Sequence, residues 1–255
     1  AAVLAAGGAE AKALARTFGR TLAKGVNTLQ EELDFAEAMQ PVANNYKNVT
    51  TVVTKADVVY RINSSKVCKK AVATAELEAL KAKVAENKAN DRAKQTVYVN
   101  GYASPDGPEK FNDKLSSARS KSGQKAVEEL LAEAGIQIDA ASYGEDWEGF
   151  KAAVAASNIA DKDLILQVLG MYDSSAQREK EIKNMSSVYK SLKTDVLPQL
   201  RRAQVVNSAD ITGKTDDEMV ALVKAGNVAA LDLEEMLHIA EARPEVAVEV
   251  LEYAA

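Results

Sequence analysis

The chain has 255 residues, enough to bury one substantial hydrophobic core or two modest ones. Its formal net charge is −5 and its sequence pI is about 5.2, with lysines and arginines interspersed among acids instead of gathered in runs. This pattern does not favour nucleic acid as a partner. No segment approaches the roughly 18 uncharged apolar residues of a membrane-spanning helix, so we expect no transmembrane segment in this chain.

The single cysteine and the single histidine limit the chemistry that the chain can perform. Cys68 cannot form an intramolecular disulfide, and we expect a buried, inert thiol there. His238 lies in a Glu-rich segment without a cysteine or a second histidine nearby, so metal binding and acid–base catalysis are not expected at this position. The sequence therefore predicts no cofactor and no metal site.

Residues 1–55 are expected to be helical and then extended. The first forty are rich in alanine, which favours helix, but they show no clean apolar stripe. The opening segment lacks an initiator Met and a basic region, so it is a poor signal peptide as written. Pro41 interrupts this segment, and the β-branched residues of 48–53 and 56–63 then favour strands.

Helical and strand patterns alternate over the next part of the chain. Between the second strand and the helix after it, SPDG (104–107) has Pro and Gly where a type I turn needs them. The expected elements are a helix over 71–88, a buried strand over 96–102, a helix over 112–134 closed by Gly135, and a strand over 136–144 with Ile136, Ile138 and Ala140 on one face.

The helix over 112–134 brings four residues to one side. Asn112, Leu115, Ser116 and Arg119 follow helical spacing. They can line the mouth beyond the carboxyl end of the preceding strand, where α/β sheets often bind ligands. Arg119 is the leading candidate, because a guanidinium binds a carboxylate through two parallel hydrogen bonds. The alternative is a surface arginine paired with nearby acids.

Residues 147–199 have helical character throughout and precede a last strand that begins near Leu200. We expect an inserted helical subdomain, anchored by Trp147 and Phe150. Residues 214–255 predict three short helices separated at Gly226 and Pro244. Two of these helices begin with capping-box patterns, Thr215 with Glu218 and Asp232 with Glu235. The helices resemble the start of a tetratricopeptide array, although one incomplete unit does not establish a repeat.

The segment 97–119, VYVNGYASPDGPEKFNDKLSSAR, resembles the signature of OmpA-like C-terminal domains. These are non-catalytic modules that hold outer-membrane proteins to peptidoglycan, and the SPDG version is similar to that of Bacteroidetes. The resemblance covers about residues 57–145 and 200–212. The matching residues are Gly101, Tyr102, Ala103, Gly107, Asn112, Leu115, Ser116 and Arg119, together with Tyr60 to Asn63, Tyr143 to Glu145, and the pair Arg201 and Arg202.

The resemblance implies an α+β fold, with a βαβαβ…β mixed sheet covered by helices. The OmpA-like domain would span 56–213 with its helical insertion at about 147–199, followed by a helical extension over 214–255. The binding motif of this chain differs from the family pattern at one position. The family usually has an aspartate that receives the diaminopimelate ammonium of the peptide stem, whereas this chain has Ser104, which offers a hydrogen bond but no charge.

The resemblance also implies a ligand site for the diaminopimelate of the peptide stem. Asp106 could substitute for the missing aspartate, and one of the two arginines at 201 and 202 could reach the pocket. Asn112 could equally brace its helix, and Leu115 could be core. The expected ligand-binding residues are Arg119, Asn112, Ser104, Asp106, Leu115, Asn63 and Arg202.

An enzyme is not expected. The chain has no G-x-S-x-G, no H-E-x-x-H and no P-loop. The acids Glu145, Asp146 and Glu148 are interpreted as a solvated helix start and not as a glycosidase pair.

The resemblance implies a periplasmic protein associated with the outer membrane. In the first hypothesis it binds or abuts peptidoglycan and anchors an outer-membrane assembly. In the alternative, it is a divergent scaffold that has lost peptidoglycan binding. It then binds outer-membrane or periplasmic partner proteins through its added helices.

Overall fold

A computed structural model describes residues 46–159 and 161–254 of the chain. They belong to two compact units, one formed by residues 51–211 and one by residues 1–50 together with 212–255. We had placed the two boundaries at 55 and 213. The helices expected in the first forty residues lie outside the described residues. None of the described helices is long and apolar enough to cross a membrane.

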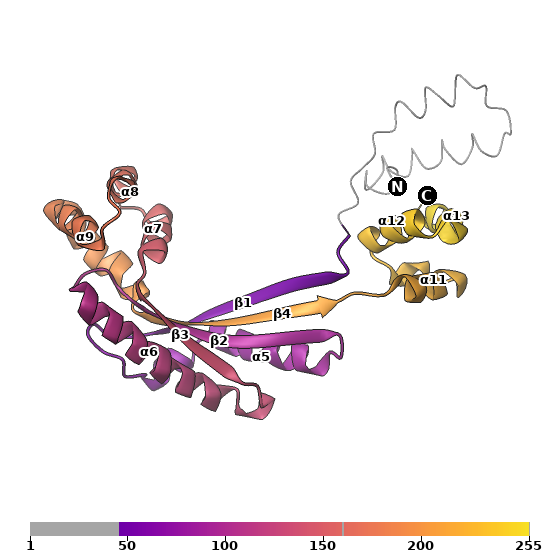
Figure 1. The fold of residues 1–255 in the computed structure, drawn as a ribbon, viewed down its shortest axis with the longest axis horizontal. Helices are drawn as coiled ribbons and strands as arrows, with labels where there is room; N and C mark the ends of the chain where they lie inside the picture. The colour runs from indigo at the N-terminus through magenta and orange to yellow at the C-terminus, as the bar shows by residue number, and fades with distance from the viewer. Residues whose placement is uncertain (1–45, 160, 255) are drawn as a thin grey trace, which may run out of the picture. The chain divides into compact units, whose positions relative to one another are not determined.

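A four-stranded mixed sheet organises the unit formed by residues 51–211 (Figure 1), so the chain has the expected α+β fold. The sheet order is β1-β4-β2-β3, with β2 parallel to β3 and antiparallel to β4. The last strand in sequence thereby lies between the first two. The strands are β1 (Val49–Val59), β2 (Ala93–Ala103), β3 (Ile138–Glu145) and β4 (Arg202–Thr212).

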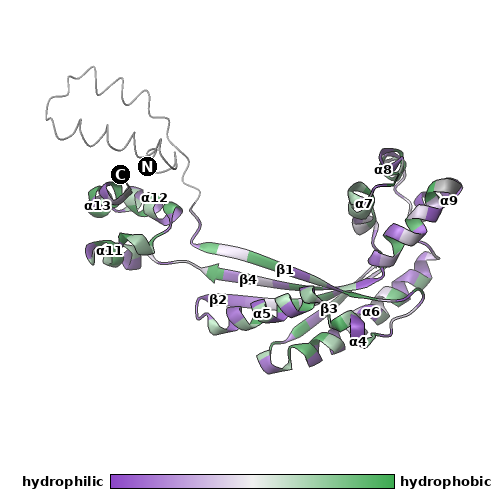
Figure 2. Ribbon diagram, turned by 180° about the vertical axis from the view of Figure 1, so that it is seen from behind, coloured by the Kyte–Doolittle hydropathy of each residue, from purple (hydrophilic) through white to green (hydrophobic). Residues whose placement is uncertain are grey.

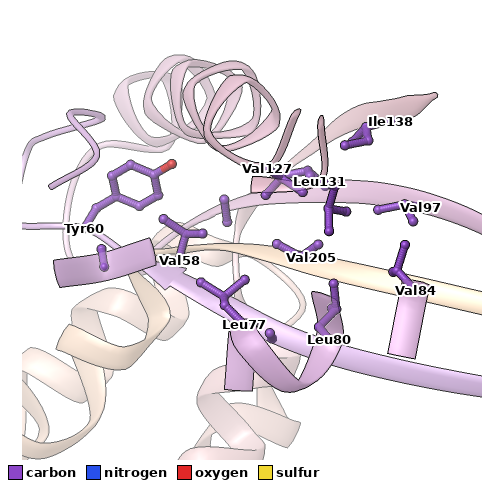
Figure 3. Packing of buried hydrophobic residues seen from close by; sticks show 14 residues of the cluster. Val58, Tyr60, Leu77, Leu80, Val84, Val97, Val127, Leu131, Ile138 and Val205 are labelled. Atoms are coloured by element: carbon purple, nitrogen blue, oxygen red, sulfur yellow. The ribbon is translucent and has the colours of Figure 1, made fainter. Parts of the chain in front are cut away.

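Helices α5 (Ala75–Ala89) and α6 (Glu109–Leu130) cover one face of this sheet (Figure 1). Strand side chains alternate between faces, and the odd-numbered residues of β2 from Val97 to Ala103 are all buried. Figure 3 shows the apolar core between helices and sheet, with Leu77, Leu80 and Val84 of α5 near β-strand side chains. Short helices flank these two elements, α4 (Lys69–Val72) before α5 and η1 (Ala132–Ala134) after α6.

Local signals account for several element boundaries. The two strand patterns at 48–53 and 56–63 merge into one continuous strand, β1, which ends at Val59, so residues 60–63 belong to the loop after it. Gly135 ends η1 in the left-handed conformation, with φ of 59°, as expected for a C-cap. The SPDG segment is a bend in which the N–H of Asp106 donates to the carbonyl of Ser104, two residues earlier, instead of the three-residue spacing of a type I turn.

The expected burial of Cys68 is wrong. Cys68 is exposed, because it lies in the loop that leads into the one-turn helix α4 and not in the core. Strand β3 lies at an edge of the sheet, and of its residues only Ile138 and Gly144 are buried.

The segment between β3 and β4 is helical and has its own apolar cluster, in which Trp147 and Phe150 are both buried. Their rings lie 5.6 Å apart in an edge-to-face arrangement. The helices gather beyond one end of the strands (Figure 1). They are α7 (Trp147–Ala156), α8 (Lys162–Met171), α9 (Ser175–Asn184), α10 (Ser186–Ser191), η2 (Leu192–Val196) and η3 (Leu197–Leu200).

The other unit contains three short α-helices after β4, as the sequence predicts, and one 3-10 helix between the first two. Both expected capping boxes are present, at Thr215 and Asp232. His238 is bonded to Asp216 at 2.9 Å and its ring stacks on that of Tyr46 at 4.1 Å. The elements are α11 (Asp216–Lys224), η4 (Val228–Ala230), α12 (Leu233–Ala242) and α13 (Pro244–Ala254).

Candidate ligand site

The motif at residues 101–119 positions α6 directly against β2. A side chain at Gly101 would place its Cβ 2.2 Å from the carbonyl oxygen of Ser116, so only glycine permits this approach. Ser116 is fully buried, and its Oγ accepts the N–H of Gly144 at 3.1 Å. These residues therefore join α6 to two strands.

Arg119 is the largest fully buried side chain of the described residues, with no exposed surface. Its Nε, Nη1 and Nη2 donate to the backbone carbonyls of Ser64, Tyr102 and Arg61 at 3.0, 2.9 and 3.3 Å. Burial lowers the pKa of Arg119 to about 10. The expectation that this guanidinium lines an open mouth is thus wrong for this structure, because three carbonyls of the chain itself surround it.

The phenol of Tyr60 completes the surroundings of Arg119. Its ring lies 5.4 Å from the guanidinium carbon, and its hydroxyl donates to the carbonyl of Arg119 at 3.1 Å. Burial raises the pKa of Tyr60, because the phenolate would lose its hydration. Tyr60 follows the last residue of β1, so this contact fixes the start of the loop that supplies two of the carbonyls.

Asn112 is buried in the first turn of α6 and braces the loop before it. Its Nδ2 donates to the carbonyls of Ser104 and Gly107 and, at 2.8 Å, to Glu145 Oε1. The other carboxylate oxygen of Glu145 accepts from Trp147 Nε1 and from the hydroxyl of Ser175. The sequence placed Glu145 in a solvated helix start, whereas the structure makes it the link between motif and helical insertion.

Ser104 and Asp106 meet an arginine, but it is Arg201. Ser104 Oγ donates to Asp106 Oδ1 at 2.6 Å, and Arg201 donates to Ser104 Oγ and to Asp106 Oδ2, both at 3.3 Å. The side chains of Arg201 and Asp106 keep only 10% and 14% of their surface exposed. The insertion contributes Tyr189, whose pKa is raised by burial and, to a lesser degree, by nearby Asp106.

Arg202, which we had assigned to the pocket, takes part in a different network. It donates to Asp57 at 2.9 Å and to Asp146 at 2.8 Å, and lies 5.5 Å from the ring centre of Tyr102. Successive residues at the start of β4 point to opposite sides, so only one of the two arginines can reach Ser104. The nearby carboxylates raise the pKa of Arg202 against the opposing effect of burial.

The remaining expected site residues do not join these networks. Asn63 is exposed in the loop after β1, where its backbone has φ of 51°. Leu115 is half-buried on α6. Of the expected set, the structure brings together Ser104, Asp106 and Asn112, adds Arg201 and Glu145, and places Arg119 behind them in the interior.

The chemistry of this cluster is that of paired charges and hydrogen bonds. The described residues contain no group of three or more side chains arranged to hold a metal ion. The one ion pair of the cluster at the edge of solvent is Arg201 with Asp106, which could exchange partners with a ligand that carries both an anion and a cation.

No model of a known protein family matches this chain, and a search of curated proteins finds no match either. The resemblance to OmpA-like domains therefore depends on the motif residues and stays a prediction.

Proposed function

We propose that the chain is a non-catalytic cell-envelope scaffold with an OmpA-like domain, periplasmic and associated with the outer membrane, whose ancestral ligand pocket is filled by its own groups. One observation carries this proposal. Arg119, Arg201 and Arg202 already have internal acceptors: carbonyls for Arg119, Ser104 and Asp106 for Arg201, and two aspartates for Arg202.

The cost of opening such a pocket favours this scaffold over a peptidoglycan binder. A carboxylate that replaced the carbonyls around Arg119 would take this donor from the part-buried carbonyls of Ser64 and Tyr102, each at a cost of about 1–3 kcal/mol. The motif residues also have structural reasons to be present, since Gly101, Ser116 and Asn112 join α6 to β2 and β3. The same motif therefore supports a domain that binds protein partners through other surfaces.

Peptidoglycan binding remains the second candidate, because the Arg201–Asp106 pair at the carboxyl end of β2 keeps a small exposed surface. Diaminopimelate has a carboxylate that could bond to Arg201 and an ammonium that could bond to Asp106. In this arrangement Asp106 supplies the charge that Ser104 lacks.

Sedimentation with purified sacculi separates the two candidates. The wild type and the Arg201→Ala variant are both expected to stay in the supernatant, with no muropeptide released. The matched control is Lys94→Ala, which removes an exposed cation on β2 away from the motif. If the wild type and Lys94→Ala pellet with the sacculi and Arg201→Ala does not, peptidoglycan binding is established. The scaffold with a filled pocket is then excluded.

A further inference from the structure

A second concave surface lies away from the motif cluster, between α6 and the segment that precedes and includes α4. It has a volume of about 530 Å³ and is lined by residues of 65–72 and 122–130. Figure 2 shows α4 beside α6. A volume of this size is within the range of ligand pockets, about 300–1,000 Å³. We name it the α4–α6 groove.

Basic side chains dominate the charge of the α4–α6 groove. Lys66, Lys69 and Lys125 line it together with a single acid, Glu129. The wall of residues 65–72 contains no acid, and the wall of residues 122–130 contains Glu128 and Glu129 beside Lys125, in a chain whose net charge is −5. The groove is thus a local reversal of the charge of the whole chain, which attracts anions at short range.

These three lysines are available to a ligand. All three are exposed, and no ion pair joins them to an acid within residues 46–159 and 161–254. Other lysines of the same unit, such as Lys83 and Lys151, are paired with a glutamate one helical turn away. The lysines of the groove therefore keep their charge free for a partner.

The floor of the groove is apolar. Val67, Val72 and Leu130 are half-buried and pack against the main core, and Ala126 joins them in the lining. A ligand that fills the groove would bury an apolar group on this floor while its anions meet the ammonium groups at the rim.

We propose that the α4–α6 groove binds an acidic peptide segment of a partner protein, in which carboxylates flank one apolar side chain. The concave shape favours a single chain over a membrane surface, because a flat bilayer would touch only the rim. The peptide would belong to a partner protein of the proposed scaffold, so the inference rests on the proposed function. The two can fail separately, since binding to sacculi tests the scaffold and peptide binding tests the groove.

Fluorescence anisotropy with a labelled peptide, acetyl-Glu-Glu-Leu-Glu-Glu-amide, measures the interaction directly. The neutral peptide with Gln in place of each Glu, and the acidic peptide with Ser in place of Leu, are both expected to bind more weakly. Each of Lys66→Glu, Lys69→Glu and Lys125→Glu should weaken binding of the acidic peptide about two- to fivefold, as for the loss of one exposed ion pair. The matched control, Lys94→Glu, carries the same charge change on β2, outside the groove.

Cys68 supplies an independent readout, because it is the only cysteine, is exposed and lines the groove. The acidic peptide should slow alkylation of the wild-type thiol by neutral N-ethylmaleimide, and the Gln peptide should not. Equal weakening by Lys94→Glu and the groove variants, or unchanged alkylation at saturating acidic peptide, would overturn the proposal. The proposal would also be overturned if the protein bound vesicles of anionic phospholipid but not the peptide, and the groove variants abolished the binding to vesicles.

Discussion

Two sets of basic side chains in the unit formed by residues 51–211 have opposite surroundings. Arg119, Arg201 and Arg202 lie near the motif, and each has partners within the chain. Lys66, Lys69 and Lys125 lie around the α4–α6 groove, exposed and without an acidic partner in the described residues. The residues that match a binding signature thus act in folding, while residues outside the signature remain available for binding.

The chemistry of the two cations explains this division. A guanidinium is weakly hydrated and presents donors in a fixed plane, so it can be buried among carbonyls. An ammonium is strongly hydrated and stays at the surface unless a partner compensates its burial. The comparison predicts that substitutions in the first set reduce stability, whereas substitutions in the second set reduce binding.

Replacing Arg119 should have the largest effect on stability. Arg119→Ala removes three part-buried hydrogen bonds. The carbonyls of Ser64 and Tyr102 lose this donor, whereas the carbonyl of Arg61 still accepts the N–H of Ser64. We expect a loss of about 3–5 kcal/mol in the free energy of unfolding, measured by urea denaturation followed by circular dichroism. Lys125→Ala is the matched control and should change the free energy by less than about 0.5 kcal/mol. A loss below about 1 kcal/mol for Arg119→Ala would contradict the structural role of this arginine.

The close approach of α6 to β2 supplies the second test. In Gly101→Ala, the new Cβ would meet the backbone of Ser116 and Ser120, at 2.2 and 2.6 Å from their O and N atoms, so the helix must move. We expect a loss of about 2–3 kcal/mol from overpacking. Gly170→Ala is the control, because its Cβ would meet nothing within 4 Å on α8. It should stabilise the protein by about 0.5–1 kcal/mol. Equal effects of the two substitutions would show that the helix tolerates displacement.

Local signals made much of the fold predictable from the sequence. The capping boxes at Thr215 and Asp232, the C-cap at Gly135 and the apolar periodicity of α5 each depend on residues that are neighbours in the chain. The alternation of helix and strand then indicated the α+β class.

The contacts of the candidate site depend on residues far apart in the sequence, so it was less predictable. Spacing identified a polar face on α6, but the acceptors of Arg119 come from positions 61, 64 and 102. Adjacent arginines at 201 and 202 are equivalent by pattern, and only the entry of β4 into the sheet decides which one meets Ser104. Glu145 likewise gains its role from Ser175, thirty residues away.

Glu145 tests the link between the motif and the helical insertion. Glu145→Gln replaces one carboxylate oxygen by an amide donor, which would face Asn112 Nδ2 or the donors Trp147 and Ser175. We expect a loss of about 1–2 kcal/mol. Trp147 is the only tryptophan, so a shift in its fluorescence reports on the insertion directly. The control is Glu148→Gln, because Glu148 is an exposed acid on α7, the helix of Trp147, and is paired with Lys151. An unchanged unfolding midpoint and an unchanged spectrum would mean that the insertion is held by its apolar contacts alone.

Tyr60→Phe should have the smallest effect, about 1 kcal/mol near neutral pH, because it removes one hydroxyl bonded to Ser122 and to the carbonyl of Arg119. The pH dependence makes this effect specific. The folded-state pKa of Tyr60 is raised above the ordinary value of 10.0. As the pH rises past 10, the phenol therefore ionises first in the unfolded chain, which stabilises the unfolded state relative to the folded one. The stability advantage of the wild type over Tyr60→Phe should therefore be complete below pH 10 and decrease above it.

Urea denaturation of both proteins between pH 8 and about 11 measures this difference, with Tyr143→Phe as the control for an exposed hydroxyl in the same unit. An advantage that stayed constant through pH 10, or that grew, would mean that the phenol is already accessible to water. The carbonyl of Arg119 would then be hydrated as well. The interior around this arginine would be open, and the contrast between its buried charge and the free lysines of the groove would no longer hold.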